Sequence, residues 1–405
     1  MELFRLEHKK LWRRASVRIS VLLCFAYVVI FGGALSYQWF EFGSADDVTS
    51  AFGNNFDGYA MIRSYQARAA GYGGYLTDES LQRMVRDIQA DDARGIFWQN
   101  ADSRSTVSAY LSQLYPELED PDAAYPTLME YYVDSAALTD LYGRRQAALE
   151  QFLHLQGQWT GREGAMLLAM NDRVDEPFRY GWVRGWQHVL SSVLPDMGLM
   201  TAVFLAVALS PVFSGEWRGN TAPLLLTTDR GRSRLALAKV SSALVFSAEL
   251  LGLLEAGTVG AQLIWLGTEG WDMPIQTIKL LAVAPMNMLQ AEIYELAFAL
   301  LGAVGFAGVV ALLSSLARSS FLSLLLSLAA AYGPMAAAQY LPAGAQKALD
   351  LLPLVGSGAD IFRTNTFHIF GGYVWSPYLL ITVPVLVGLA CLPPAVVVWS
   401  RRRRP

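Results

Sequence analysis

The chain has 405 residues, of which 53% are hydrophobic and only 16% are charged, with a formal net charge of -4. Soluble globular domains carry about 25% charged residues, so this composition argues against a soluble protein and indicates a membrane protein. Both cysteines, Cys24 and Cys391, fall inside apolar runs. We therefore expect no disulfide in the polar part of the chain, and the cysteine spacing predicts no metal site.

Six apolar runs are each long enough to cross a bilayer, which takes about 20 helical residues. Backbone polar groups inside a bilayer must be paired within the segment, so each run is expected to be an α-helix. We expect an all-α polytopic membrane protein with six transmembrane helices and a mostly helical extracellular domain between the first two. The runs are 19–40, 194–213, 243–266, 296–316, 321–341 and 378–399.

Residues 1–18 have the pattern of a cytoplasmic helix that lies in the membrane interface. Phe4, Leu11 and Trp12 fall on one helical face, and basic residues cover the rest. The alternative is a disordered basic leader. The run 19–40 resembles a signal peptide in position, but it exceeds the usual apolar core of about 7–15 residues, so an uncleaved anchor is expected.

Residues 41–193 form the large polar segment, which is predicted to be extracellular. Positions 41–192 hold 22 acidic residues against 12 arginines and no lysine, a net charge of -10. Thr77 followed by Asp-Glu-Ser indicates a helix start. Leu81, Met84, Val85 and Ile88 then recur at helical spacing. The segment therefore predicts one small, mostly helical domain.

An aromatic cluster precedes the second apolar run. Phe178, Tyr180, Trp182 and Trp186 lie close to the predicted membrane boundary. This position is typical of an interfacial aromatic belt, and a ligand-binding patch is the alternative.

Basic residues fix the expected orientation. They concentrate in 1–18, in the connection 214–242 and in the tail 400–405, whereas 267–295 and 342–377 hold few. This bias places both termini in the cytoplasm. The segment 342–377 is then extracellular, either re-entrant or folded over the helix ends. The arginine run in the tail is expected to anchor the orientation and contact anionic lipid, and not to bind nucleic acid.

The motifs of several enzyme classes are missing from the sequence. The dipeptide Gly-Lys of a phosphate-binding loop does not occur, and neither do the His-Glu-x-x-His and Gly-x-Ser-x-Gly patterns. The sequence therefore predicts no catalytic, cofactor-binding or metal site. Work done by this protein must draw its energy from elsewhere.

Two glutamates stand inside the third apolar run. Glu249 and Glu255 lie 10 and 16 residues beyond Lys239, which places Glu249 near the middle of the bilayer at about 1.5 Å per residue. A carboxylate there is costly and should face the bundle interior or a cavity, or be protonated. Both residues are candidates for lining a translocation path or for responding to protons, and hydrogen bonding for packing is the alternative. Glu292 and Glu295 are expected at a solvated helix edge.

The connection 214–242 carries the most specific pattern of the chain. Glu216 is followed by Thr221, by the run Leu224–Thr228, and by Arg230, Gly231, Arg232 and Lys239. This order resembles the permease subunits of type-2 ABC transporters (the ABC-2 family). Two positions depart from the family pattern: Asn220 stands where the family has Gly, and Asp229 where Pro is common. Asn also tolerates left-handed backbone, so we expect the turn to survive.

The resemblance implies a function and partners. The layout is similar to the peptide export and immunity branch of Gram-positive bacteria, which implies a multi-pass protein of the bacterial plasma membrane. Such a permease moves peptide, lipid or drug with ATP hydrolysed by a separate ABC ATPase subunit, so it binds no cofactor itself. The implied partners are that ATPase, a second permease subunit in a homo- or heterodimer, and membrane lipids, with no nucleic acid.

The same resemblance assigns roles in the connection. Glu216, Arg218, Thr221, Arg230 and Arg232 are the implied ATPase-coupling residues. Glu216 and Arg218 would contact the ATPase or brace the connection against the N-terminal helix. The alternative function is a membrane-anchored sensor or binding protein whose extracellular domain is the active part. A scaffold of that kind has no need of a patterned cytoplasmic connection.

Overall fold

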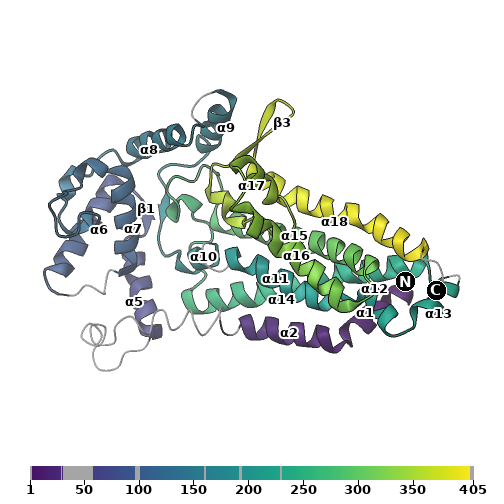
Figure 1. Ribbon diagram of the computed structural model, residues 1–405. Helices are drawn as coiled ribbons and strands as arrows, with labels where there is room; N and C mark the ends of the chain where they lie inside the picture. The colour runs from purple at the N-terminus through teal and green to yellow at the C-terminus, as the bar shows by residue number, and fades with distance from the viewer. Residues whose placement is uncertain are drawn as a thin grey trace.

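The computed structural model describes residues 2–28, 30, 58–95, 101–158, 161–190, 194–228 and 230–401. Most of these residues are helical. Figure 1 shows a long helical bundle with a smaller helical domain at one end and both chain termini at the other. We call the smaller part the distal domain; it is formed by the described residues between 58 and 180.

The bundle confirms a multi-pass helical membrane protein. Among the described residues, five helical stretches are long and apolar enough to cross a membrane. The predicted span 19–40 extends beyond the described residues, so the count of six stays a prediction. The bundle helices are α1 (Glu2–Trp12), α2 (Ala15–Tyr27), α11 (Leu194–Leu209), α12 (Pro211–Arg218), α13 (Ala222–Thr227), α14 (Ser233–Leu266), α15 (Met288–Leu316), α16 (Ser320–Ala338) and α18 (Ser376–Arg401).

Helix α15 is the centre of the bundle and packs against α11, α14, α16 and α18. Small residues allow α15 and α18 to touch backbone to backbone. A Cβ atom at Gly308 would lie 2.4 Å from the carbonyl oxygen of Gly388, so glycine is required for this approach. On the outside, Phe321 and Leu386 are 74% and 61% exposed. Exposed apolar side chains of this size are expected on helices that face lipid or another subunit.

Several helices extend past the predicted ends of the apolar runs. Helix α14 begins at Ser233 and α15 at Met288, each several residues before its apolar run. The predicted second apolar run ends at residue 213, but α12 continues the helical stretch of α11 to Arg218. Polar residues at these ends are therefore helical, and most of the connection predicted over 214–242 belongs to α12, α13 and α14.

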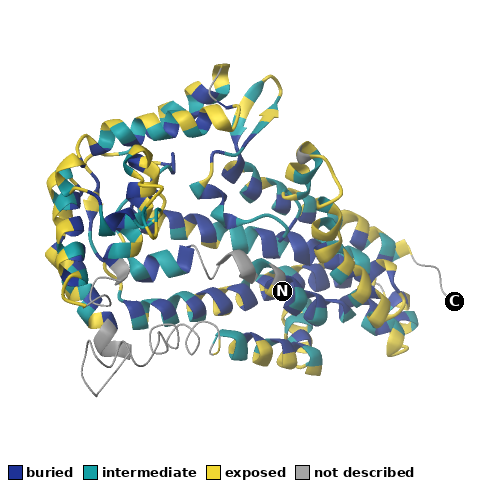
Figure 2. Cartoon of the chain, turned by 60° about the vertical axis from the view of Figure 1, so that its left-hand side comes forward, coloured by how far each residue is buried: buried dark blue, intermediate teal, exposed yellow. Residues whose placement is uncertain are grey.

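The distal domain is built from short helices around its own apolar core. Thr77 caps α6 in a capping box with Ser80, which confirms the predicted helix start. The described residues of this segment are mostly helical, and Figure 2 shows exposed residues around its outer edge. Its helices are α5 (Gly58–Gly71), α6 (Asp78–Asp92), α7 (Ala101–Leu114), α8 (Leu141–Leu155) and α9 (Gly161–Asn171), with 3-10 turns at η3 (Pro116–Leu118), η4 (Met129–Tyr131) and η5 (Ser135–Ala137).

The described residues contain two small antiparallel sheets, each of two strands. Strand β1 (Gly74–Tyr75) pairs with β2 (Arg179–Tyr180), which holds the two ends of the distal domain together. Strands β3 (Thr366–Ile369) and β4 (Gly372–Trp375) form a hairpin in which Thr366 lies opposite Trp375.

The loop before α18 folds against helix ends. Its helix α17 (Ala343–Leu349) packs on α16, and its 3-10 turn η8 (Gly358–Phe362) packs on α15 and α18. This arrangement corresponds to the second of the two expectations for 342–377.

The aromatic cluster before α11 is buried in protein, so its interpretation as a lipid-facing belt is wrong. Phe178 and Tyr180 belong to the core of the distal domain. Trp182 donates its indole N–H to the carbonyl of Leu266, and Trp186, in α10 (Arg184–His188), donates to Thr268 at 3.1 Å. The last carbonyls of a helix lack partners within it. The two indoles supply partners where α14 ends and so fasten the distal domain to the bundle.

Candidate functional site

Residues 218–232 connect α12 to α14 and include the short helix α13; we call this connection the elbow. The N–H of Gly219 bonds to the carbonyl of Gly215 at 3.0 Å, and that of Thr221 to the carbonyl of Glu216 at 3.0 Å. Between them Asn220 has φ 53°. Asn enters this left-handed region more readily than most residues. The turn therefore survives with Asn, as predicted, whereas Asp229 lies outside the described residues.

The second half of the elbow closes on α13. A Cβ atom at Gly231 would lie 1.7 Å from the carbonyl oxygen of Leu225, so any side chain there would force the elbow to shift. Arg232 donates from Nε to the carbonyl of Leu226 at 3.1 Å. From the end of α18, Trp399 donates its indole N–H to the carbonyl of Gly231 at 3.0 Å. The elbow is thus a closed turn held against the last helix of the bundle.

A buried ionic cluster links the elbow to two other helices. Lys10 of α1 donates to Glu216 Oε1 at 2.5 Å, and Lys239 of α14 donates to the same oxygen at 2.7 Å. Lys239 also donates to Glu7 Oε2 at 2.7 Å. Thr221 donates its hydroxyl to Glu216 Oε2. We call Glu7, Lys10, Glu216, Thr221 and Lys239 the Glu216 cluster.

Because Glu216 and Lys239 are buried, their charges must stay paired for the cluster to be stable. The side chains of Lys239 and Glu216 are 0% and 4% exposed. Two carboxylates balance two ammonium groups, and removal of a fully buried partner such as Lys239 costs about 3–5 kcal/mol. Burial lowers the pKa of the neighbouring Arg14, and the carboxylates of Glu216 and Glu7 oppose this shift. The cluster therefore fixes α1, the elbow and α14 relative to one another.

The candidate coupling residues fall into two groups. Glu216 and Thr221 are hydrogen-bonded to each other and hold the first turn of the elbow. Arg218, Arg230 and Arg232 are exposed. Leu224 of α13 is exposed as well, by 70%. The sequence identified the charged residues, whereas it did not mark Leu224 as exposed because that leucine belongs to an apolar run.

Helix α1 also accounts for Glu249. The carboxylate of Glu249 accepts the indole N–H of Trp12 at 3.1 Å and lies 3.2 Å from His8 Nε2. Its side chain is 41% exposed. Because α1 packs along α14, Glu249 faces that helix and not the bundle interior, which corrects the expected position. The amphipathic helix predicted near the N-terminus is present, and its Trp12 ring packs on Phe246 at 5.3 Å.

Glu255 does lie inside the bundle, together with two glutamates that the sequence placed at a solvated edge. Glu255 and Glu295 are 3% and 2% exposed, and Glu292 of α15 is half-buried nearby. Within the described residues, neither carboxylate oxygen of Glu255 has a hydrogen-bond partner. The expectation for Glu295 was wrong because η8 packs on α15 and covers this carboxylate. The approach is so close that a Cβ atom at Gly358 would lie 1.6 Å from Glu295 Oε2. Glu292 and Glu295 are three residues apart, so they are neighbours on one helix face. This spacing was the signal in the sequence that the two carboxylates lie close together.

Comparison with family models, with curated proteins and with solved structures finds no match to this chain. In the part of the chain that the structure describes, no three His, Cys, Asp or Glu side chains are arranged to hold a metal ion. The functional assignment therefore rests on the residues and their geometry.

Proposed function

We propose that this chain is the membrane-spanning permease half of an ATP-driven exporter, and that its elbow receives force from a separate ATPase subunit. The observation that carries the proposal is the Glu216 cluster. A short turn that only joined two spans would not need a buried carboxylate shared by two lysines. A turn that transmits force does need one, because it must move α14 without bending.

The surface of the elbow supports contact with a protein. It combines the exposed Leu224 with the exposed arginines Arg218, Arg230 and Arg232. Apolar anchors surrounded by arginine are typical of protein interfaces. An ATPase with an acidic rim around an apolar groove would fit this surface. The exposed faces of α16 and α18 leave room for lipid or for the second permease subunit of a dimer.

Within this proposal, Glu255, Glu292 and Glu295 line part of the translocation path. Glu255 and Glu295 are buried in the bundle and Glu292 is half-buried, and an isolated charge is costly in such surroundings. Cargo or solvent that reached them would relieve this cost. Glu249, in contrast, belongs to the contact between α1 and α14.

The experiment is affinity purification of the chain from its native membrane, followed by measurement of ATP hydrolysis in the purified complex. The wild type is expected to carry a hydrolysing partner. A variant with Leu224→Ser and Arg230→Ser should lose most of this activity, on the order of tenfold, because it removes an apolar anchor and its charged neighbour.

The matched control is Tyr125→Ser, which changes a 72% exposed side chain of the distal domain. It should retain the activity, and all variants should have the thermal midpoint of the wild type. If the wild type carries no hydrolysing partner, or if the elbow variant keeps it, the proposal is wrong.

The second candidate is a membrane-anchored sensor, and the observation that favours it is a cavity between the segments 173–179 and 272–290. A sensor would bind its ligand there and would carry no ATPase at the elbow, so the same purification separates the two functions.

A further inference from the structure

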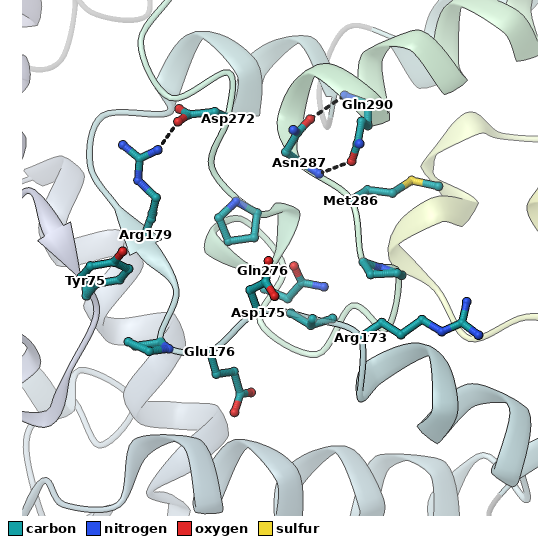
Figure 3. Close-up of a pocket in the computed structure, with 14 residues that line it drawn as sticks. Tyr75, Arg173, Asp175, Glu176, Arg179, Asp272, Gln276, Met286, Asn287 and Gln290 are labelled. Carbon is teal, nitrogen blue, oxygen red and sulfur yellow. Dashed lines mark hydrogen bonds and ion pairs between the residues drawn. The ribbon is translucent and has the colours of Figure 1, made fainter.

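A cavity of about 710 Å³ lies where the distal domain meets the start of α15. Its walls are the segment 173–179, which follows α9, and the connection 272–290, which leads into α15 (Figure 3). Cavities that hold small molecules measure about 300–1,000 Å³. The cavity has the size of a ligand site, and the permease role proposed above does not use it.

The side chain of Gln276, in the cavity wall, has an amide oxygen that accepts no hydrogen bond from a described residue. The residue is 0% exposed, and its Nε2 donates to the carbonyls of Ala282 and Ala284 at 2.9 and 2.8 Å. Carbonyls only accept, so these two bonds fix which end of the amide is nitrogen. The oxygen Oε1 then has no partner among the described residues. A buried acceptor of this kind costs about 1–3 kcal/mol until a donor reaches it.

A carboxylate lines the same cavity. The side chain of Asp175 belongs to the wall that contains Gln276, while Arg173 points away from both (Figure 3). Asp175 is exposed and forms no ion pair with another described residue. The cavity wall therefore contains an exposed carboxylate without a cationic partner and an amide oxygen without a protein donor.

Three of the other charged residues on the wall are paired with a partner, and Arg173 extends away from Asp175 and Gln276 (Figure 3). Arg179 forms an ion pair with Asp272. Glu176 turns away from the centre and binds the buried Arg145 at 3.0 Å. An anionic ligand would have to break the Arg179 pair, whereas a cation meets the free Asp175. The acidic surroundings of the distal domain add to the preference for a cation.

The remaining wall is apolar and stiff. Pro177, Pro274 and Pro285 line it together with Tyr75 and Met286. Proline rings and an aromatic ring lose little conformational freedom when they contact a ligand. This wall suits the apolar body of a ligand whose charged end reaches Asp175 and Gln276.

We propose that this cavity binds an organic cation, a molecule in which a primary ammonium or guanidinium group is attached to an apolar body. The cation donates hydrogen bonds to Asp175 and to Gln276 Oε1, and the body packs on the proline-lined wall. The site lies at the end of the molecule opposite the elbow and does not depend on the elbow's role.

The test is isothermal titration calorimetry on the full-length protein in lipid nanodiscs, without any partner. Two cationic probes distinguish the sources of the group: phenethylamine represents a free amine, and acetyl-phenylalanyl-lysine amide represents a peptide side chain. At least one probe should bind, and the tighter one identifies the source. The same peptide with an acetylated lysine should bind at least tenfold more weakly, because it has lost its charge.

The variant Asp175→Asn should weaken the cationic probe about tenfold, as expected for loss of a charge-assisted hydrogen bond. The control Asp172→Asn removes the same charge from an exposed position three residues earlier, outside the cavity wall, and should bind as the wild type does. The proposal is overturned if neither probe binds, if the acetylated peptide binds as well as the charged one, or if the two variants behave alike.

Discussion

At the scale of single residues, Glu216 shows how one carboxylate can hold distant segments together. It accepts hydrogen bonds from Lys10, which lies 206 residues earlier in the sequence, and from Lys239, which lies 23 residues later. The two lysines differ in burial, since their side chains are 47% and 0% exposed. The two lysine–Glu216 ion pairs therefore contribute differently to the free energy of unfolding.

This difference gives a prediction. Lys239→Met should destabilise the protein by about 3–5 kcal/mol, because it leaves Glu216 and Glu7 buried beside one less positive charge. Lys10→Met should cost at most about 1 kcal/mol, since a solvated ammonium contributes little. Thermal unfolding of the detergent-solubilised protein checks both variants. Equal losses would mean that the cluster is hydrated and that its burial carries no energetic weight.

At the scale of elements, the elbow depends on close backbone contacts more than on helix propensity. Helix α13 has six residues and stands between two turns. Asn220 supplies the left-handed residue of the first turn, and Gly231 allows the second to close on Leu225. An isolated helix of this length is not stable in water, so its packing neighbours hold it in place.

Gly231→Ala is expected to open the elbow and destabilise the protein by about 1–3 kcal/mol, the usual cost of forcing a group into a filled space. The same substitution at Gly260 in α14, where a Cβ atom would meet nothing within 4 Å, is the matched control and should be close to neutral. Thermal midpoints of the two variants, together with their ATPase content, provide the measurement. Similar behaviour of the two would contradict the tight closure of the elbow.

At the scale of the whole molecule, the elbow and the distal domain lie at opposite ends of the bundle (Figure 1). The apolar helices between them are long enough to cross a membrane. If they do, force applied at the elbow must travel along α14 and its neighbours to reach the distal domain. The indole contacts of Trp182 and Trp186 at the far end of α14 provide the connection.

This arrangement predicts opposite accessibility of the two ends. Leu224→Cys and Tyr125→Cys place single thiols at exposed positions of the elbow and the distal domain, in a background where Cys24 and Cys391 are replaced by Ala. In intact cells, a membrane-impermeant maleimide should label the Tyr125 position only, and lysis should expose the Leu224 position. Labelling of both positions in intact cells would place the elbow outside and remove the basis for an ATPase partner.

The sequence alone determined the helical multi-pass class, the capped start of α6 and the survival of the turn at Asn220. These features depend on apolar run length, on local hydrogen bonding and on the backbone freedom of single residues, all of which act over a few neighbouring positions. Only the tertiary structure placed Lys10 and Lys239 on Glu216, turned Glu249 toward α1 and buried Glu295 under η8. It also placed Asp175 and Gln276 on the wall of one cavity. Such contacts join segments far apart in the chain, and their energies depend on burial, which chain order does not specify.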